Sequence, residues 1–525
     1  MRRTGSRGGA ENAENAEEAH RNDSFSHAAL QCLCGTLPTL KRFLSHIRTN
    51  LGYPQIPSSG SDRGASRMQI PFINAAKSGF LFRRRIVLAA LAVGVLALVW
   101  SYRNLRSADR LEQLATRARA RGVPASRMDL ERQYPFQPAV YSNFLAFNTL
   151  FAGLPYPPPS ASAATKGVTN RWRPVSKEML AWMETYTATA TQLQQRLLEG
   201  VSLDFGIRLG PAIVEFPHNF SDHQAAVTLL RMQAEWAFEK GRMDAGVAAM
   251  IAAARMIRYN GGDYSTTGAI IRQNEIKSTY DSVQNLWVPG PGRFSDTQLR
   301  DLQQAFAQLL EAPTLNSVFR INWAAHMDFF RSDDNWMQDL LFKGAPPDGF
   351  LSLLLRCAYE LSGSKSADVY DHLRISDARC EAFLGSMTQR QQRLQALDAE
   401  VAVILKKWNR PLFQSLTGNI PILNRRELWC IAWIRTVVTT FAVERFRLKY
   451  DRLPVDTAAL VPEFLPEVPL DPIDEKPLRY HREGSGYVVY SIGANGRDDD
   501  GQLGPAENEN AASATVEGDQ GIRVQ

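Results

Sequence analysis

The sequence predicts a mainly α-helical protein with a single N-terminal transmembrane helix, an all-α ectodomain and a small α+β module near the C-terminal end. Three observations predict this class. An unbroken apolar run covers 86–100, helical periodicity recurs between about 105 and 450, and a strand–turn–strand pattern covers 477–492. The chain has 525 residues with a mean hydropathy of −0.26, a value that excludes a multi-pass membrane protein.

The apolar run has fifteen residues without a polar side chain and follows three consecutive arginines, 83–85. About 17–20 residues cross a hydrocarbon core, and the run reaches this length when 80–82 contribute. A cleaved signal peptide and a buried core helix are the alternatives. The end of the run lacks the small-residue pattern of a cleavage site, and the run is not amphipathic. We therefore interpret 80–102 as an uncleaved signal anchor that places the N-terminus inside and the body outside the cytoplasm.

Charge is divided unevenly along the chain. Residues 1–121 carry 19 Lys and Arg against 8 Asp and Glu, or +11, and the rest carries 41 against 46, or −5. A nucleic-acid-binding protein needs its basic excess on the folded face that meets phosphate, whereas here the excess flanks the apolar run. The lipid bilayer is thus the expected partner, nucleic acid is not, and the expected location is a bacterial inner membrane with a periplasmic body.

Both ends of the chain have compositions that cannot bury a core. Residues 1–67 combine a short Glu/Asn/Ala repeat with Ser/Gly/Arg-rich text, and Met68 would give a conventional short n-region. We interpret 1–67 as a disordered leader from an over-extended gene start. Residues 503–525 show no apolar periodicity and are predicted to be a disordered tail.

The region 105–426 is predicted to be a helical ectodomain. Ser221 has capping-box spacing ahead of a helix that ends at Gly241, and a second helix is expected from about Met243 to Tyr259. Ser295 begins another helix. The sequence contains no metalloprotease, nucleophile-elbow or phosphate-loop motif in a position where it could work, so no catalytic residue is assigned.

The segment 427–502 follows a different pattern. A helix runs into Tyr-x-x-Leu-Pro at 450–454, then Asp-Pro-x(4)-Pro-Leu-x-Tyr at 471–480, then Tyr-Ser-x-Gly-x-Asn-Gly-x-Asp-x-Asp at 490–500. These elements, in this order, resemble the globular end of the major pseudopilin of type II secretion. Arg84 stands where that family has a glutamate, and the anchor lies over three hundred residues upstream. We therefore expect a pseudopilin-like module behind a long ectodomain, without assembly into a pseudopilus.

In the pseudopilin family the terminal loop binds calcium, and the resemblance implies the same for this chain. Asp498 and Asp500 would be the carboxylate ligands, with Asn495 or Asp499 and carbonyl oxygens near Ser491 as auxiliary ligands. Calcium takes six to eight hard oxygen ligands and tolerates irregular loops, which is consistent with this composition. The alternative is a solvated acidic turn.

Two functions remain open at the level of sequence. The first is a membrane-tethered scaffold or interaction protein of the bacterial envelope, associated with secretion-machine proteins and carrying a calcium-ordered C-terminal loop. The second is an exported, hydrolase-like enzyme whose active site is assembled from helical side chains that sequence spacing does not reveal. Because no nucleophile–base pair can be identified, the first function is preferred.

Overall fold

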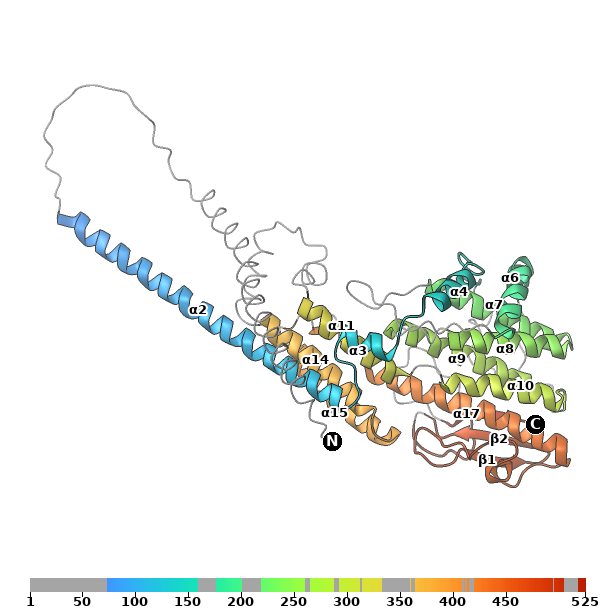
Figure 1. Ribbon diagram of the computed structural model, residues 1–525. Helices are drawn as coiled ribbons and strands as arrows, with labels where there is room; N and C mark the ends of the chain where they lie inside the picture. The colour runs from blue at the N-terminus through green and yellow to red at the C-terminus, as the bar shows by residue number, and fades with distance from the viewer. Residues whose placement is uncertain are drawn as a thin grey trace, which may run out of the picture. The chain divides into compact units, whose positions relative to one another are not determined.

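The computed structural model describes residues 73–158, 176–200, 219–259, 265–287, 292–311, 314–332, 359, 364–407, 410, 413–414, 420–493, 495–504 and 518–525. Across these residues the chain is mainly helical, with thirteen α-helices, two 3₁₀-helices and one three-stranded antiparallel sheet (Figure 1). The predicted class, mainly α with a small sheet near the C-terminal end, is confirmed. The chain divides into two units, 1–85 and 86–525, and the hydrophobic clusters belong to the second. The predicted leader 1–67 lies outside the described residues.

The predicted anchor lies within α2 (Ile73–Ala120), a continuous helix of 48 residues. Large apolar side chains such as Leu91 and Leu98 are exposed, Leu98 to 71%, whereas Leu114 near the other end of the helix is buried. Several side chains over 80–102 lie outside the described residues. In the part of the chain that the structure describes, no helix combines the length and the apolar character needed to cross a membrane. The helix is thus confirmed, and its transmembrane placement is not.

The buried end of α2 belongs to a first hydrophobic cluster, and most of the other side chains in this cluster come from four helices. They are α3 (Arg127–Gln133), α11 (Leu315–Ser332), α14 (Ser364–Ala382) and α15 (Met387–Leu405). Trp323 of α11 is fully buried in this cluster, and its Nε1 donates a hydrogen bond of 2.9 Å to the carbonyl of Leu373 on α14. Burial of such a large ring with its polar atom satisfied fixes the contact between the two helices.

A second, larger group comprises α4 (Pro138–Asn148), α5 (Lys177–Thr185), α6 (Thr187–Leu198), α7 (Phe220–Glu239), α8 (Met243–Tyr259), α9 (Thr266–Leu286), α10 (Asp296–Ala307) and the 3₁₀-helix η3 (Gln308–Glu311). The predicted helical hairpin is α7–α8, and Gly241 turns it with φ of +71°. The capping box at Ser295 is present. The cap predicted at Ser221 is wrong: Asn219 caps α7, and its side chain accepts from the Ser221 amide.

The helix predicted over 427–450 is α17 (Ile420–Tyr450), which begins seven residues earlier. One side of it packs on the second group. Phe441 is fully buried, and its ring centroid lies 6.0 Å from that of Trp287 and 5.9 Å from that of Phe306. Nearer the start of the helix, Trp433 stacks on Tyr280 with 5.4 Å between ring centroids. The aromatic side chains of α17 therefore complete the core of the preceding helices.

The other side of α17 packs on the sheet (Figure 1). The Tyr487 hydroxyl donates 2.8 Å to Glu444, and both side chains are buried. Three threonines in the middle of the helix are also buried, and each hydroxyl donates to the carbonyl four residues earlier: Thr436, Thr439 and Thr440. These bonds allow α17 to bury polar side chains on both sides without leaving a hydroxyl unsatisfied.

The sheet has the order β1 (Arg479–Glu483), β2 (Gly486–Ser491) and β3 (Gln520–Val524), and a 3₁₀-helix, η4 (Thr457–Leu460), precedes it. β1 pairs antiparallel with β2, which confirms the predicted hairpin, and Gly484 supplies the positive φ of its turn. All of β2 is buried, because it is the central strand and faces α17.

The prediction of a disordered C-terminal tail is wrong at its end. β3 pairs antiparallel with β2 from Tyr487–Val524 to Ser491–Gln520, and Ile522 and Val524 are buried. The Tyr280 hydroxyl on α9 donates 2.9 Å to the Gly521 carbonyl. Two apolar side chains at alternate positions can be buried as a strand when the partner strand is already in place. A pattern of only two such residues is too short to predict a strand from the sequence alone. Residues 505–517 lie outside the described residues.

The boundary predicted at 427 does not separate two cores. A single hydrophobic cluster contains residues from α7, α8, α10, α17, β2 and β3. The segment that resembles a pseudopilin therefore shares its core with the helices before it, because α17 presents apolar side chains to both.

Substitution Ile522→Ala tests the contribution of β3. We expect it to lower the free energy of unfolding of the full chain by about 2–5 kcal/mol, because it leaves a cavity under α17. Val455→Ala, at a side chain that is 71% exposed, should change it by less than about 0.5 kcal/mol. Denaturant unfolding followed by circular dichroism measures both. Equal effects of the two variants would contradict the placement of β3 in the core.

Candidate functional site

The polar network around the sheet begins at Asp471, which is fully buried in the turn before β1. Its Oδ1 accepts hydrogen bonds of 2.9 Å from the Ser491 hydroxyl and from the Ile473 amide. Its Oδ2 accepts 2.9 Å from the Ile492 amide and 3.1 Å from Nη1 of Arg479. Four donors compensate the burial of this carboxylate, which therefore fixes the end of β2 against the turn.

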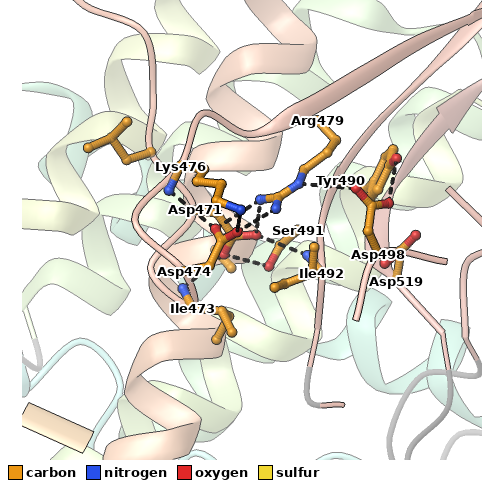
Figure 2. A network of polar contacts seen from close by, with 12 residues as sticks. Asp471, Ile473, Asp474, Lys476, Arg479, Tyr490, Ser491, Ile492, Asp498 and Asp519 are labelled. Atoms are coloured by element: carbon orange, nitrogen blue, oxygen red, sulfur yellow. Dashed lines mark hydrogen bonds and ion pairs between the residues drawn. The ribbon is translucent and has the colours of Figure 1, made fainter. Parts of the chain in front are cut away.

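Arg479, the first residue of β1, holds three carboxylates together (Figure 2). In addition to Asp471, its guanidinium binds Asp474 through two nitrogens, with Nη1 at 3.0 Å from Oδ1, and its Nε lies 3.5 Å from Asp498. Burial alone would raise the pKa of Asp474, but the hydrogen bonds from Arg479 and from the Lys476 amide lower it below its usual value. The hydrogen bond to Asp474 in turn raises the pKa of Arg479. This forked pairing suits arginine and not lysine.

The acidic loop, defined as residues 495–501, follows β2. Its backbone is curved by residues with positive φ, Gly496, Asp500 and Gly501. The Asp498 carboxylate accepts 3.0 Å from the Tyr490 hydroxyl and 3.2 Å from the Asp500 amide. The Tyr490 hydroxyl thereby joins the loop to the strand from which it leaves.

Asp519, just before β3, faces the same loop. Its carboxylate is completely buried and accepts hydrogen bonds from the amides of Asp499, at 3.1 Å, and Gly501, at 2.8 Å. Burial raises the pKa of Asp519, the two amides oppose the change, and the negative charges of Asp498 and Asp499 raise it further. Within the part of the chain that the structure describes, no lysine or arginine forms an ion pair with Asp519. Among the described residues, the loop thus concentrates negative charge around a buried carboxylate that has no ion-pair partner.

The predicted calcium ligands are only partly brought together. The side chain of Asn495 donates 2.8 Å to Asp499, which lies beside Asp519. Ser491 is buried, and its hydroxyl points to Asp471 instead of to the loop. Asp498 is oriented toward Tyr490 and Arg479, and Asp500 donates its backbone amide to Asp498. The structure thus brings Asn495 to Asp499 and directs the Ser491 side chain to Asp471, whereas the resemblance implied a role for carbonyl oxygens near Ser491.

The oxygen groups of the loop meet some requirements of a metal ion. Among the described residues, no three or more His, Cys, Asp or Glu side chains converge on one point closely enough to hold a metal. Calcium, however, also takes amide and backbone oxygens, and it needs uncompensated negative charge. The buried Asp519 with its neighbouring aspartates provides that charge. The loop therefore contains oxygen donors of the types that calcium takes.

Sequence reasoning missed three residues of this network, namely Asp471, Arg479 and Asp519. The first belongs to the Asp-Pro pair used for the resemblance, but nothing in its spacing indicates burial. Arg479 looks like an exposed strand residue, and Asp519 falls in the segment predicted as disordered. The alternation of apolar residues just after Asp519 was the available signal.

A second polar pair, a buried and a half-buried histidine, lies between two helices of the first hydrophobic cluster. Nε2 of His372 on α14 and Nδ1 of His326 on α11 are 3.1 Å apart. Burial lowers the pKa of His326 to about 4 and that of His372 well below its usual value. Both rings are therefore neutral at pH 7, and the contact is a hydrogen bond between two imidazoles that joins the helices.

Substitution Arg479→Met tests the network. We expect a loss of about 3–5 kcal/mol in the free energy of unfolding, because three carboxylates lose their common cation. Arg497→Met removes an exposed charge of the same loop and should change it by less than about 0.5 kcal/mol.

The free energy of unfolding of Arg479→Met should also depend on pH differently from that of the wild type. The lowered pKa of Asp474 contributes stability above its unfolded value near pH 4, and this stability is lost as the pH falls through the folded value. Arg479→Met should therefore lose less stability than the wild type between pH 5 and pH 2. Parallel acid unfolding curves for the two proteins would contradict the network.

Comparison with known proteins does not assign this arrangement. No family model matches the chain, and no curated protein or solved structure is significantly similar to it. The function has to be argued from the geometry of the site itself.

Proposed function

We propose that the protein is a membrane-tethered scaffold or interaction protein of the bacterial envelope, with a C-terminal acidic loop that binds calcium. It would cross the inner membrane once and expose its body to the periplasm. The observation that carries the proposal is the buried Asp519 carboxylate, which is surrounded by acidic side chains. The resemblance to a pseudopilin supports the same loop and suggests envelope or secretion-machine proteins as partners.

Exposed apolar side chains on α2 support the tether. Leu88, Leu91, Val95 and Leu98 are each more than half exposed. Exposure of so many large apolar side chains on one helix is costly in water and favourable in lipid. Arginines precede this stretch, and Tyr102 follows it, as at the two edges of a bilayer.

The polar side chains of the site support a binding surface. Arg479 forms hydrogen bonds and ion pairs with Asp471 and Asp474. The Asp498 carboxylate belongs to the same network through its contact with Arg479. Such a network holds the acidic loop in one position relative to the core. A loop fixed in this way can present carboxylate and carbonyl oxygens to a cation or to a partner without first being ordered.

Asp519 and Asp499 would supply the charged calcium ligands, with Asn495 and backbone oxygens of the loop as neutral ligands. The exposed Asp498 carboxylate lies at the edge of this set, where it is shared with Arg479. Calcium would neutralise the repulsion that raises the pKa of Asp519.

Calcium is expected to stabilise the folded full chain. In detergent at pH 7, a hundredfold excess of Ca²⁺ over Kd should add about 2.7 kcal/mol, seen as a higher Tm than in chelator. Asp519→Asn should abolish the shift. Asp500→Asn, which removes the same charge from an exposed side chain, should retain most of it.

The calcium effect should also depend on pH. Because the pKa of Asp519 is raised, the metal-free protein loses stability as the pH rises through that value, and protons compete with calcium below it. The Tm shift should therefore be smaller at pH 4 than at pH 7. An unchanged Tm with Ca²⁺ at pH 7, or a shift that Asp519→Asn retains, would contradict the site.

The tether is tested separately. Full-length protein expressed in a Gram-negative host should remain in the membrane pellet after a high-salt wash and be released by detergent. A variant that lacks 80–102 should move to the soluble fraction. Release of the full-length protein by salt alone would contradict the tether and leave the calcium proposal untouched.

A further inference from the structure

Six large apolar side chains follow one face of the exposed part of α2. Each of them is more than half exposed: Leu88, Leu91, Val95, Leu98, Tyr102 and Leu105. Successive members are three and four residues apart in alternation, which is the spacing of a coiled-coil seam. On an α-helix this spacing places all six side chains on one side over roughly 26 Å. We call this set the seam.

The end of the seam distinguishes it from the other faces of α2. Within the apolar run every face is apolar, because the run is unbroken. Just beyond the run, Ser101 and Arg106 make other faces polar. Tyr102 and Leu105, both exposed, keep the seam apolar. Because Leu105 also lies outside the predicted anchor 80–102, contact with lipid alone does not account for the whole seam.

The body leaves the seam free, because α2 contacts it through the opposite side. The Ser107 hydroxyl donates a hydrogen bond of 3.3 Å to the carbonyl of Ser366 on α14, and Leu114 and Ala118 are buried in the first hydrophobic cluster. With 3.6 residues per turn, these three α2 residues lie about half a turn from the end of the seam. A second helix can therefore contact the seam without displacing a contact between α2 and the body.

The residue types in the seam favour a second copy of the chain as the partner. Positions 91, 98 and 105 correspond to position d of a heptad, and all three are leucine. Val95 occupies the central position a. Leucine at d with a β-branched residue at a is typical of parallel two-stranded coils. The six seam positions carry no charge, so two identical seams can pack without repulsion.

The charges that follow the seam define where such a pairing ends. The next two positions of the same spacing are Asp109 and Glu112, and both are exposed. In a parallel pair each carboxylate would face its counterpart, and like charges repel. The pairing therefore stops at Leu105, two residues before Ser107 contacts the body.

We propose that two copies of this chain pair along the α2 seam as a parallel two-stranded coil. Each seam side chain would then meet its counterpart across a two-fold axis. The parallel direction rests on the tether proposed above, because two anchors inserted in the same way run in the same direction. The seam itself rests on its spacing and on the exposure of its side chains. A pair of this kind would carry two bodies, each with its own acidic loop.

Disulfide trapping of the full chain in inner-membrane vesicles tests the seam. The parent chain carries three substitutions that limit the background: Cys32→Ser, Cys34→Ser and Cys357→Ser. The two remaining thiols are buried. Leu98→Cys puts a thiol on the seam, and its matched control, Ala97→Cys, puts one at the same depth on another exposed face.

Copper phenanthroline in air is the oxidant. Leu98→Cys should give at least about fivefold more disulfide-linked dimer than Ala97→Cys, because only facing Cβ atoms come within reach of a disulfide. Equal yields from the two variants, or no dimer from Leu98→Cys, would overturn the proposal. Protein found in the soluble fraction would contradict the tether, and the same comparison in that fraction would then decide the seam.

Leu105→Cys tests the direction of the pair. In a parallel coil the two new thiols face each other and should be trapped, whereas in an antiparallel pair they lie at opposite ends of the seam. A dimer trapped by Leu98→Cys but not by Leu105→Cys would overturn the parallel coil.

The charges at the end of the seam provide an independent measurement. Asp109→Leu combined with Glu112→Leu should extend the seam by one heptad and lower the Kd of the dimer at least about tenfold. Asp109→Lys combined with Glu112→Lys keeps like charges at both positions and should not lower it. Analytical ultracentrifugation of the full-length protein in detergent measures the Kd. A Kd that the leucine substitutions leave unchanged would overturn the seam.

Discussion

The packing of α17 on two sides at once is the constraint on which the rest of the body depends. On one side Phe441 and Trp433 complete the aromatic core of α9 and α10, and on the other Glu444 receives the hydroxyl of Tyr487 from β2. A helix that is buried on both sides must satisfy its own polar side chains, which its threonines do by bonding to the preceding turn. Removal of either layer would expose apolar surface on the other.

The acidic loop inherits its position from this packing. β2 is fixed by α17, β3 is fixed by β2 and by the hydroxyl of Tyr280, and Asp519 stands directly before β3. Arg479 then connects the start of β1 with the turn at Asp471 and with the loop at Asp498. The negative charge around Asp519 therefore follows from the fold, because the amides of Asp499 and Gly501 hold the acidic loop against this carboxylate. A cation at this position would relieve that charge.

Sequence patterns predicted those helices and strands that a few neighbouring residues determine. The helical hairpin of α7 and α8, the capping box at Ser295 and the β1–β2 hairpin each depend on a few neighbouring residues, and each is present. The third strand was missed because five residues between a turn and the chain end carry too little periodicity. The boundary predicted at 427 follows a local change of sequence pattern. In the structure this position lies within α17, whose burial depends on residues over a hundred positions away.

The candidate site was predictable only where the motif is contiguous. The resemblance named Asn495 and Asp499, which lie in the acidic loop that the structure describes. The roles of Asp519 and Asp471 could not be predicted, since they come from tertiary contacts that give a buried carboxylate its donors. The same holds for His223, whose ring contacts Glu275, 52 positions away in the sequence. Long-range pairing of polar groups leaves no periodic trace in a sequence.

Hydrogen–deuterium exchange of the full chain, with and without calcium, tests whether the sheet and the preceding helices form one core. Amides of β2, β3 and α17 should exchange in the same slow class as those of α8 and α10, because they share one hydrophobic cluster. Calcium should also slow exchange in the acidic loop and in β3. A sheet that exchanges independently of α8 and α10 would contradict the shared core, and a loop that calcium leaves unchanged would contradict the calcium site.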